Sequence, residues 1–164
     1  MSYFATSIDA AASLAPVSVD RLAQVLDDAG LNVGYCEDRS RLGGFWGQHL
    51  VEFCFHGKAS SVLRIQACWG RPLSADHRAD VLDWVNAYNL EWIWPKMYVD
   101  RNGEDLVVMA EHAVSYECGA SDEQLFAHVR CAVSAALDAF GRLDDTFPQA
   151  VDDFRAQHPD WPDQ

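Results

Sequence analysis

The sequence predicts a single α+β domain in which helices flank a mainly antiparallel sheet. Three observations support this fold class. A chain of 164 residues, 49% of them hydrophobic, is long enough to bury one core without metals or disulfides. Its apolar residues change along the chain between a helical period of about 3.6 and the strand period of two. Short turn signals, and not long crossovers, separate the expected strands, as in antiparallel hairpins.

The expected elements alternate between the two periods. In chain order they are a helix at Val19–Ala29, strands at Leu31–Cys36, Trp46–His56 and Ser61–Gly70, a helix at Ala75–Asn89, strands at Trp94–Asp100, Asp105–Glu111 and Ala113–Cys118, a long helix after Ser121, and a helix at Pro148–Gln157. A turn is expected at Arg39–Gly44, because it ends in two glycines.

The helices are identified by their caps and their apolar stripes. Ser18, Ser74 and Ser121 each precede a helical stretch and can accept a hydrogen bond from its first free N–H groups. Gln124 lies three residues after Ser121 and completes a capping box. The last helix, Pro148–Gln157, opens on a proline, which is favoured in the first turn.

The strands are identified by alternation and by their turns. Trp46–His56 places apolar residues on one face and mostly polar ones on the other, and Ser61–Gly70 does the same after a short turn. These two stretches should pair as an antiparallel hairpin. A second hairpin is predicted where Asn102 and Gly103 join two apolar runs, since Asn-Gly is a strong signal for a two-residue turn.

The domain organisation follows from where the patterns begin and end. Residues 1–16 are expected to form a flexible leader, residues 17–157 a single domain, and residues 158–164 a flexible tail. The first residues lack a basic leader with an apolar stretch, and no apolar run is long enough for a membrane span. We therefore expect a cytoplasmic protein without a membrane partner.

The charge of the chain limits its partners. The formal net charge is -13, and lysine occurs only at Lys58 and Lys96. Such a protein repels phosphate backbones, and no basic stripe compensates for this. Nucleic acid is therefore not an expected partner.

Cysteine and histidine offer a weak candidate for chemistry. The five cysteines show no CxxC spacing and lie in apolar segments, which is typical of reduced, packed thiols. Cys54 and His56 lie two residues apart on one strand face, and His112 lies in another strand. A small-molecule or metal-dependent enzyme using Cys54, His56 or His112 is therefore the alternative hypothesis. The principal one has no catalytic, cofactor-binding or metal-binding residues and no cofactor.

Aromatic residues concentrate where the middle helix gives way to the sheet. Trp92 and Trp94 share a face of an extended segment, and Pro95 belongs at a strand start or edge because it cannot donate to a ladder. Burial in the core is the favoured interpretation of the rings. The alternative is an aromatic groove at the sheet edge beside Lys96. Asn89 and Asn86 are expected to satisfy backbone groups at this junction.

Several segments together resemble a known family. They are Leu42-Gly-Gly-Phe-Trp-Gly-Gln-His49, Val62-Leu-Arg-Ile-Gln-Ala-Cys-Trp69, Val85-Asn-Ala-Tyr-Asn89, Ile93-Trp-Pro-Lys-Met-Tyr-Val99, Ala110-Glu111 and Gly119-Ala-Ser-Asp-Glu-Gln-Leu125. From Ser18 to Pro148 the chain resembles the actinobacterial branch of the YbjN family, whose members are described as bacterial sensory transduction regulators.

The resemblance implies a fold similar to type III secretion chaperones, often paired into dimers, and it implies no catalytic residues. We therefore expect a non-enzymatic protein-binding or chaperone-like module, acting as a sensory transduction or stress regulator. Its expected partners are another protein or peptide segment and a second copy in a homodimer. The candidate partner-binding residues are Trp46, Trp92, Trp94, Pro95 and Lys96.

Overall fold

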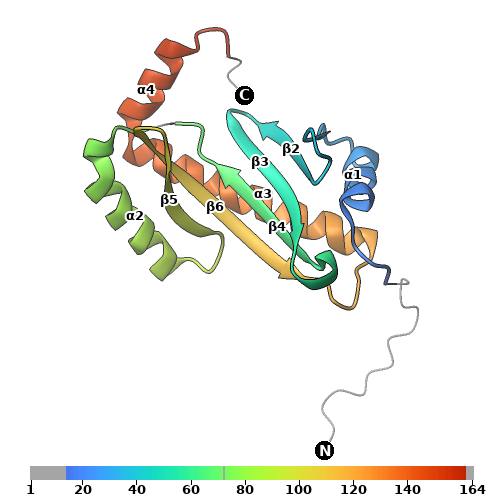
Figure 1. The fold of residues 1–164 in the computed structure, drawn as a ribbon. Coiled ribbons are helices and arrows are strands. Elements are labelled where there is room, and N and C mark those ends of the chain that lie inside the picture. The colour runs from blue at the N-terminus through green and yellow to red at the C-terminus, as the bar shows by residue number, and fades with distance from the viewer. Residues whose placement is uncertain (1–13, 72, 162–164) are drawn as a thin grey trace, which may run out of the picture.

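The computed structural model describes residues 14–71 and 73–161. Four α-helices lie in this part of the chain, and two short 3-10 turns accompany them (Figure 1). The bounds are α1 Val19–Asp28, η1 Lys58–Ser60, η2 Ala75–His77, α2 Arg78–Glu91, α3 Asp122–Thr146 and α4 Pro148–Gln157. The leader residues 1–13 and the tail residues 162–164 lie outside the described residues.

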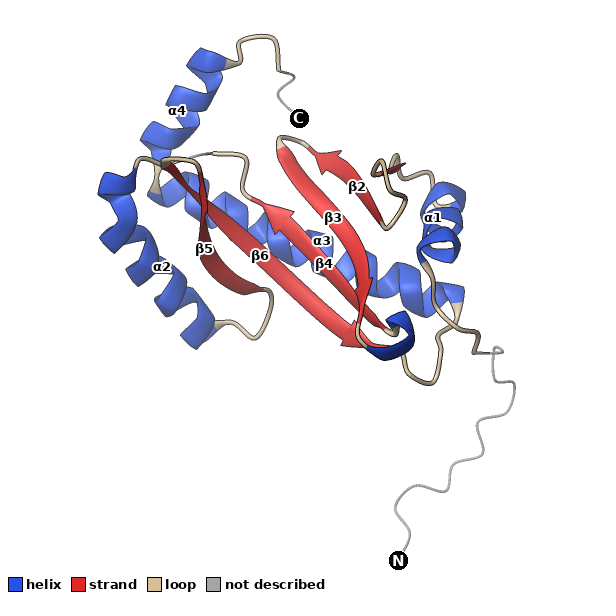
Figure 2. Cartoon of the chain, in the orientation of Figure 1, coloured by secondary structure: helices blue, strands red, loops and turns tan. Residues whose placement is uncertain are grey.

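A single antiparallel sheet forms the centre of the molecule (Figure 2). Its strands are β1 Gly34–Tyr35, β2 Arg41–Trp46, β3 His49–His56, β4 Val62–Cys68, β5 Lys96–Asn102 and β6 Asp105–Ser115. The spatial order is β1-β2-β3-β4-β6-β5, so the second hairpin joins the first through β6. The described architecture confirms the α+β class and the antiparallel sheet flanked by helices.

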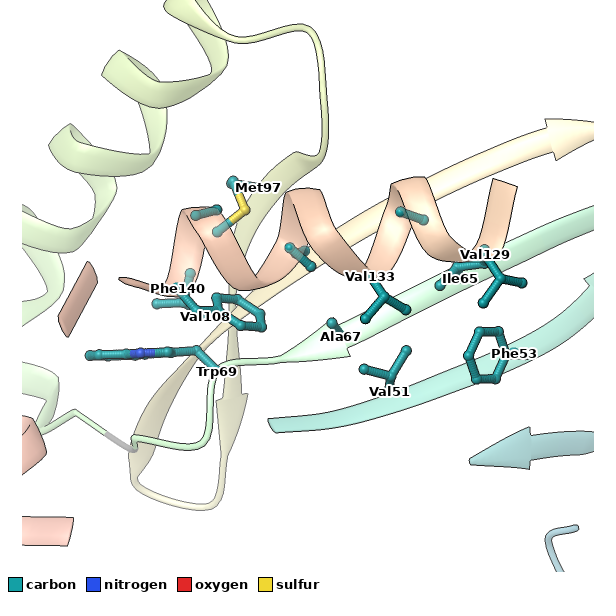
Figure 3. Close-up of a cluster of buried hydrophobic side chains, with 14 of the residues drawn as sticks. Val51, Phe53, Ile65, Ala67, Trp69, Met97, Val108, Val129, Val133 and Phe140 are labelled. Carbon is teal, nitrogen blue, oxygen red and sulfur yellow. The ribbon is translucent and has the colours of Figure 1, made fainter. Parts of the chain in front are cut away.

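The core lies between one face of the sheet and the long helix α3. In Figure 1, α3 passes behind β4 and β6, while α1 packs beside it and α2 packs against β5. Alternate residues of the strands point toward α3, as the strand period requires. Figure 3 shows this cluster, which includes Val51, Phe53, Ile65, Ala67, Trp69, Met97, Val108, Val129, Val133 and Phe140.

The opposite face of the sheet carries a row of paired charges. Arg41 lies 3.3 Å from Glu52, and Glu111 forms ion pairs with Arg64 at 3.3 Å and with Lys96 at 2.5 Å. These pairs cross strands that are neighbours in the sheet, so they add side-chain contacts to the backbone ladder.

Two sequence predictions about the strands are wrong. The turn expected at Arg39–Gly44 is largely strand β2, and the turn lies instead at Gly47 and Gln48. A glycine is needed within β2 because a Cβ on Gly44 would lie 2.9 Å from the carbonyl oxygen of Asn32. The two strands expected between Asp105 and Cys118 are one strand, β6, since no glycine or proline interrupts the alternation.

The caps and turns confirm most of the remaining predictions. Ser18 accepts from the N–H of Arg21, and Ser121 and Gln124 form the expected capping box. The predicted hairpin joins β5 to β6, with its turn at Gly103 and Glu104, and the last helix has the predicted bounds. Ala15, within the expected leader, forms a bridge with Ala120.

Candidate protein-binding surface

Four large apolar side chains are exposed where α2 ends and β5 begins. Leu90 and Ile93 are each 90% exposed, Trp94 is 53% exposed and Trp92 is 41% exposed. We call these four residues the aromatic ridge. Apolar residues scattered singly over a surface are ordinary, whereas four at one junction mark a candidate interaction site.

The backbone under the ridge is held by hydrogen bonds from α2. The Asn89 amide donates to the carbonyl of Met97 and accepts from its N–H, both at 2.9 Å. The Tyr88 hydroxyl donates to the carbonyl of Trp94 at 3.1 Å. Asn89 therefore has the junction role that the sequence predicts. It also occupies the edge of β5 at Met97, where an added strand would have to displace it.

The two ridge tryptophans are supported from below by other side chains. The Trp92 ring stacks on Tyr88 with centroids 6.2 Å apart, and the Arg142 guanidinium lies 4.6 Å from the Trp92 centroid. Trp94 meets the buried His112 edge-on at 4.8 Å. Each ring is thus partly packed and partly exposed, and tryptophan is enriched among binding hot spots.

The interpretation of Trp92 and Trp94 as core residues is therefore wrong. The chain turns from helix to strand at these residues, so the alternating buried face begins only at Pro95 and Met97. The remaining candidates lie elsewhere. Trp46, in β2, is half-buried and packs against Phe53, and β2 lies far from β5 in the strand order of the sheet. Pro95 is buried, and Lys96 is exposed but paired with Glu111.

Sequence reasoning missed three residues of this surface: Leu90, Ile93 and Arg142. Leu90 and Ile93 belong to an apolar run at the end of a helix, where polar residues are usual. This unusual composition could have indicated an exposed apolar surface. Arg142 lies on α3, far along the chain, so no local pattern could place it over Trp92.

Of the three residues of the enzyme alternative, Cys54 and His56 lie together, but His112 does not join them. Cys54 Sγ lies 3.0 Å from His56 Nε2, but burial raises the pKa of the Cys54 thiol, which disfavours the reactive thiolate. His112 is opposite Ile65 and faces the core, whereas Cys54 is opposite Arg64 on the other face. The described residues contain no group of three or more metal ligands.

The fold and the surface define a small α+β protein whose distinctive exposed feature is apolar. Among the described residues, no helix is both long and apolar enough to cross a membrane. The chain belongs to the YbjN family, whose model matches residues 18–145 and is described as "Putative bacterial sensory transduction regulator". Family membership thus agrees with the resemblance in the sequence.

A solved structure shares the fold. It is the "Crystal structure of YbjN, a putative transcription regulator from E. coli", and its chain is 16% identical to this one with a TM-score of 0.70. The match covers 82% of this chain and 96% of that one. Among curated proteins, none matches the sequence.

Proposed function

We propose that this chain is a non-enzymatic regulator that binds another protein through the aromatic ridge. The exposure of Leu90, Trp92, Ile93 and Trp94 carries the proposal. Tryptophan is enriched among the residues that dominate the energetics of protein interfaces, and rings that are already partly packed lose little freedom on binding. The family description as a regulator supports a binding role.

The kind of partner follows from the shape and charge of the surface. Because Asn89 occupies the β5 edge at Met97, an apolar side-chain contact fits better than strand addition. The partner is therefore an apolar, helical or extended segment of another cytoplasmic protein. The net charge of -13 argues against direct contact with nucleic acid, so any effect on transcription would act through a protein partner.

A chaperone-like homodimer is the assembly we infer. The sequence resembles the actinobacterial branch of the family, and this resemblance implies a fold similar to type III secretion chaperones, which are often paired into dimers. Two copies would present two ridges to one client. Light scattering coupled to size exclusion, with titration of a hydrophobic dye, tests this assembly. A dimer that binds dye supports it, and a monomer that binds none removes both the dimer and the accessible ridge.

The partner contact is tested by site-specific crosslinking in cells. A photoreactive amino acid replaces Ile93, and in a control chain it replaces Glu37, an exposed residue in the segment between β1 and β2. The proposal requires a protein captured at position 93 and not at position 37. The captured protein is then purified and titrated against the wild type and against the double variant Leu90→Ser, Ile93→Ser. Equal affinity for the two chains contradicts the ridge as the binding surface.

A further inference from the structure

A second feature, separate from the ridge, is a cavity of about 540 Å³ beside the turn between β2 and β3, away from β5 in the sheet. The turn between β2 and β3 forms one wall, the end of α3 forms another, and α4 contributes an arginine. Its lining includes Phe45, Trp46, His49, Arg71, Gly141 and Arg155. The volume lies within the range of roughly 300–1,000 Å³ that is usual for small-molecule sites.

Arg71 in the wall of this cavity is buried without full pairing. The residue is 6% exposed, and its Nη2 donates to Asp144 Oδ2 over a long 3.4 Å. Asp144 also accepts a shorter bond of 2.7 Å from Trp69 Nε1, so its carboxylate is shared. Among the described residues, Arg71 Nε and Nη1 have no hydrogen-bond partner. The positive charge of the buried guanidinium is therefore balanced by one shared carboxylate, which favours a further anion nearby.

The charged residues that line the cavity are mainly basic, unlike the chain as a whole. The lining holds two arginines, Arg71 and Arg155, and one carboxylate, Asp144, on a chain whose net charge is -13, and Asp152 lies 4.0 Å from Arg155. Burial lowers the pKa of Arg71, Asp144 opposes this, and Arg155 lowers it further. The arginines thus repel each other across the site. An anion between them would relieve this repulsion.

His49 offers a further donor to the same space. Its Nδ1 accepts a 3.1 Å bond from the N–H of Gly70, so the ring proton of the neutral form lies at Nε2. Gly70 can make this contact only as glycine, because a Cβ there would lie 2.1 Å from the carbonyl oxygen of Gln48. The close approach of the two segments therefore builds this wall of the cavity.

We propose that the cavity binds a small organic anion. A carboxylate or phosphate group is held by Arg71, Arg155 and the Nε2–H of His49, and an apolar or ring-shaped body packs against Phe45 and Trp46. Phe154 on α4 lies under the Arg71 guanidinium at 4.9 Å, and Trp161 meets Phe45 edge-on at 5.8 Å. Residues of α4 and the chain after it therefore pack against two residues of the cavity wall.

Matched small probes test the anion and the organic body separately. Benzoate and phenyl phosphate are compared with benzamide, which has the shape of benzoate without its charge, and with inorganic phosphate. Ligand-observed NMR and thermal shift measure binding to the full chain. We expect at least one of the two aromatic anions to bind about tenfold or more tightly than benzamide, since charge-assisted bonds provide the difference. The stronger of benzoate and phenyl phosphate identifies the anionic group. Equal binding of benzamide, or binding of inorganic phosphate alone, overturns the proposal.

Two variants locate the probe in the cavity. Gly141→Leu places a side chain where a Cβ meets no atom within 4 Å, in a helix that favours leucine over glycine. We expect this variant to fold and to lose probe binding, and Arg155→Gln to weaken binding about tenfold. Arg101→Gln, at the exposed tip of the β5-β6 hairpin, is the charge-matched control and should bind as the wild type. Unchanged affinity in Gly141→Leu would show that the anion binds elsewhere.

Discussion

Two tryptophans at strand ends have opposite environments. Trp69 directly follows β4 and is fully buried, with its indole N–H bonded to Asp144. Trp94 lies just before β5, separated from it by Pro95, and is 53% exposed. Trp69 continues the alternation of β4, whose odd-numbered residues face α3, whereas Trp94 lies before the alternation of β5 begins. Position relative to the strand register, and not residue type, decides which ring is core.

The largest expected difference is in the cost of removing each ring. Trp69→Ala should lower the free energy of unfolding by about 3–5 kcal/mol, because it leaves a cavity and removes the donor to Asp144. Urea unfolding followed by circular dichroism measures this. Trp46→Ala, at a half-buried ring packed on Phe53, is the control and should cost less. A loss below about 1 kcal/mol at Trp69 would contradict its place in the core.

The part of the molecule that holds the cavity should also make its folding stability sensitive to acid, through His49. Burial, together with the Arg71 charge, lowers the pKa of His49 to about 4 from its ordinary 6.5. As the pH falls below 6.5, the unfolded chain takes up this proton first, so stability is lost between pH 6.5 and pH 4. After allowance for partial exposure, the loss should be about 2 kcal/mol.

His49→Asn isolates this contribution, since asparagine can keep an acceptor for the Gly70 N–H but does not titrate. We expect the variant to lose less stability than the wild type between pH 7 and pH 4.5, as measured by urea unfolding at each pH. His56→Asn, at an exposed histidine, is the matched substitution control. Parallel curves for wild type and His49→Asn would mean that His49 is not held neutral.

The ridge depends on its backbone support more than on its rings. Asn89→Ala removes two hydrogen bonds from Met97 and should cost about 1–3 kcal/mol, since a part-buried backbone donor and acceptor lose their partner. Asn86→Ala, on the same helix and exposed, is the matched control and should change little. Hydrogen exchange at the Met97 amide should rise in the first variant alone. Equal stability of the two variants would contradict this role of Asn89.

Local chemistry made most of the fold predictable. The serine caps, the Asn-Gly hairpin and the alternation of Val51 with Phe53 each depend on neighbours a few residues away, and all are found in the structure. The failure at Gly43 and Gly44 has a different cause. Two adjacent glycines predict a turn unless another chain segment packs closely against them. Here the Asn32 carbonyl does so, and no pattern in the residues around Gly43 and Gly44 reveals that contact.

The candidate site was less predictable because its parts come from separate elements. The sequence located the tryptophans, but their exposure depends on where α2 ends and the register of β5 begins. The cavity was not predicted at all. Arg71, His49 and Arg155 are 22 to 106 residues apart, and only the packing of α3 and α4 against the sheet brings them to one space.

The smallest expected effects are at the ridge itself. Trp94→Ala should cost about 1 kcal/mol, because only the side of the ring that meets His112 is packed. Ile93→Ser should change stability by less than about 0.5 kcal/mol, since the side chain is 90% exposed. Both should nevertheless reduce binding of a hydrophobic dye, whereas Trp69→Ala, if it folds, should not. Thermal melts and dye titrations on the same samples separate the two quantities. A loss of about 3 kcal/mol or more in the free energy of unfolding of Trp94→Ala would mean that this ring is a core residue, and the ridge could then not bind a partner through it.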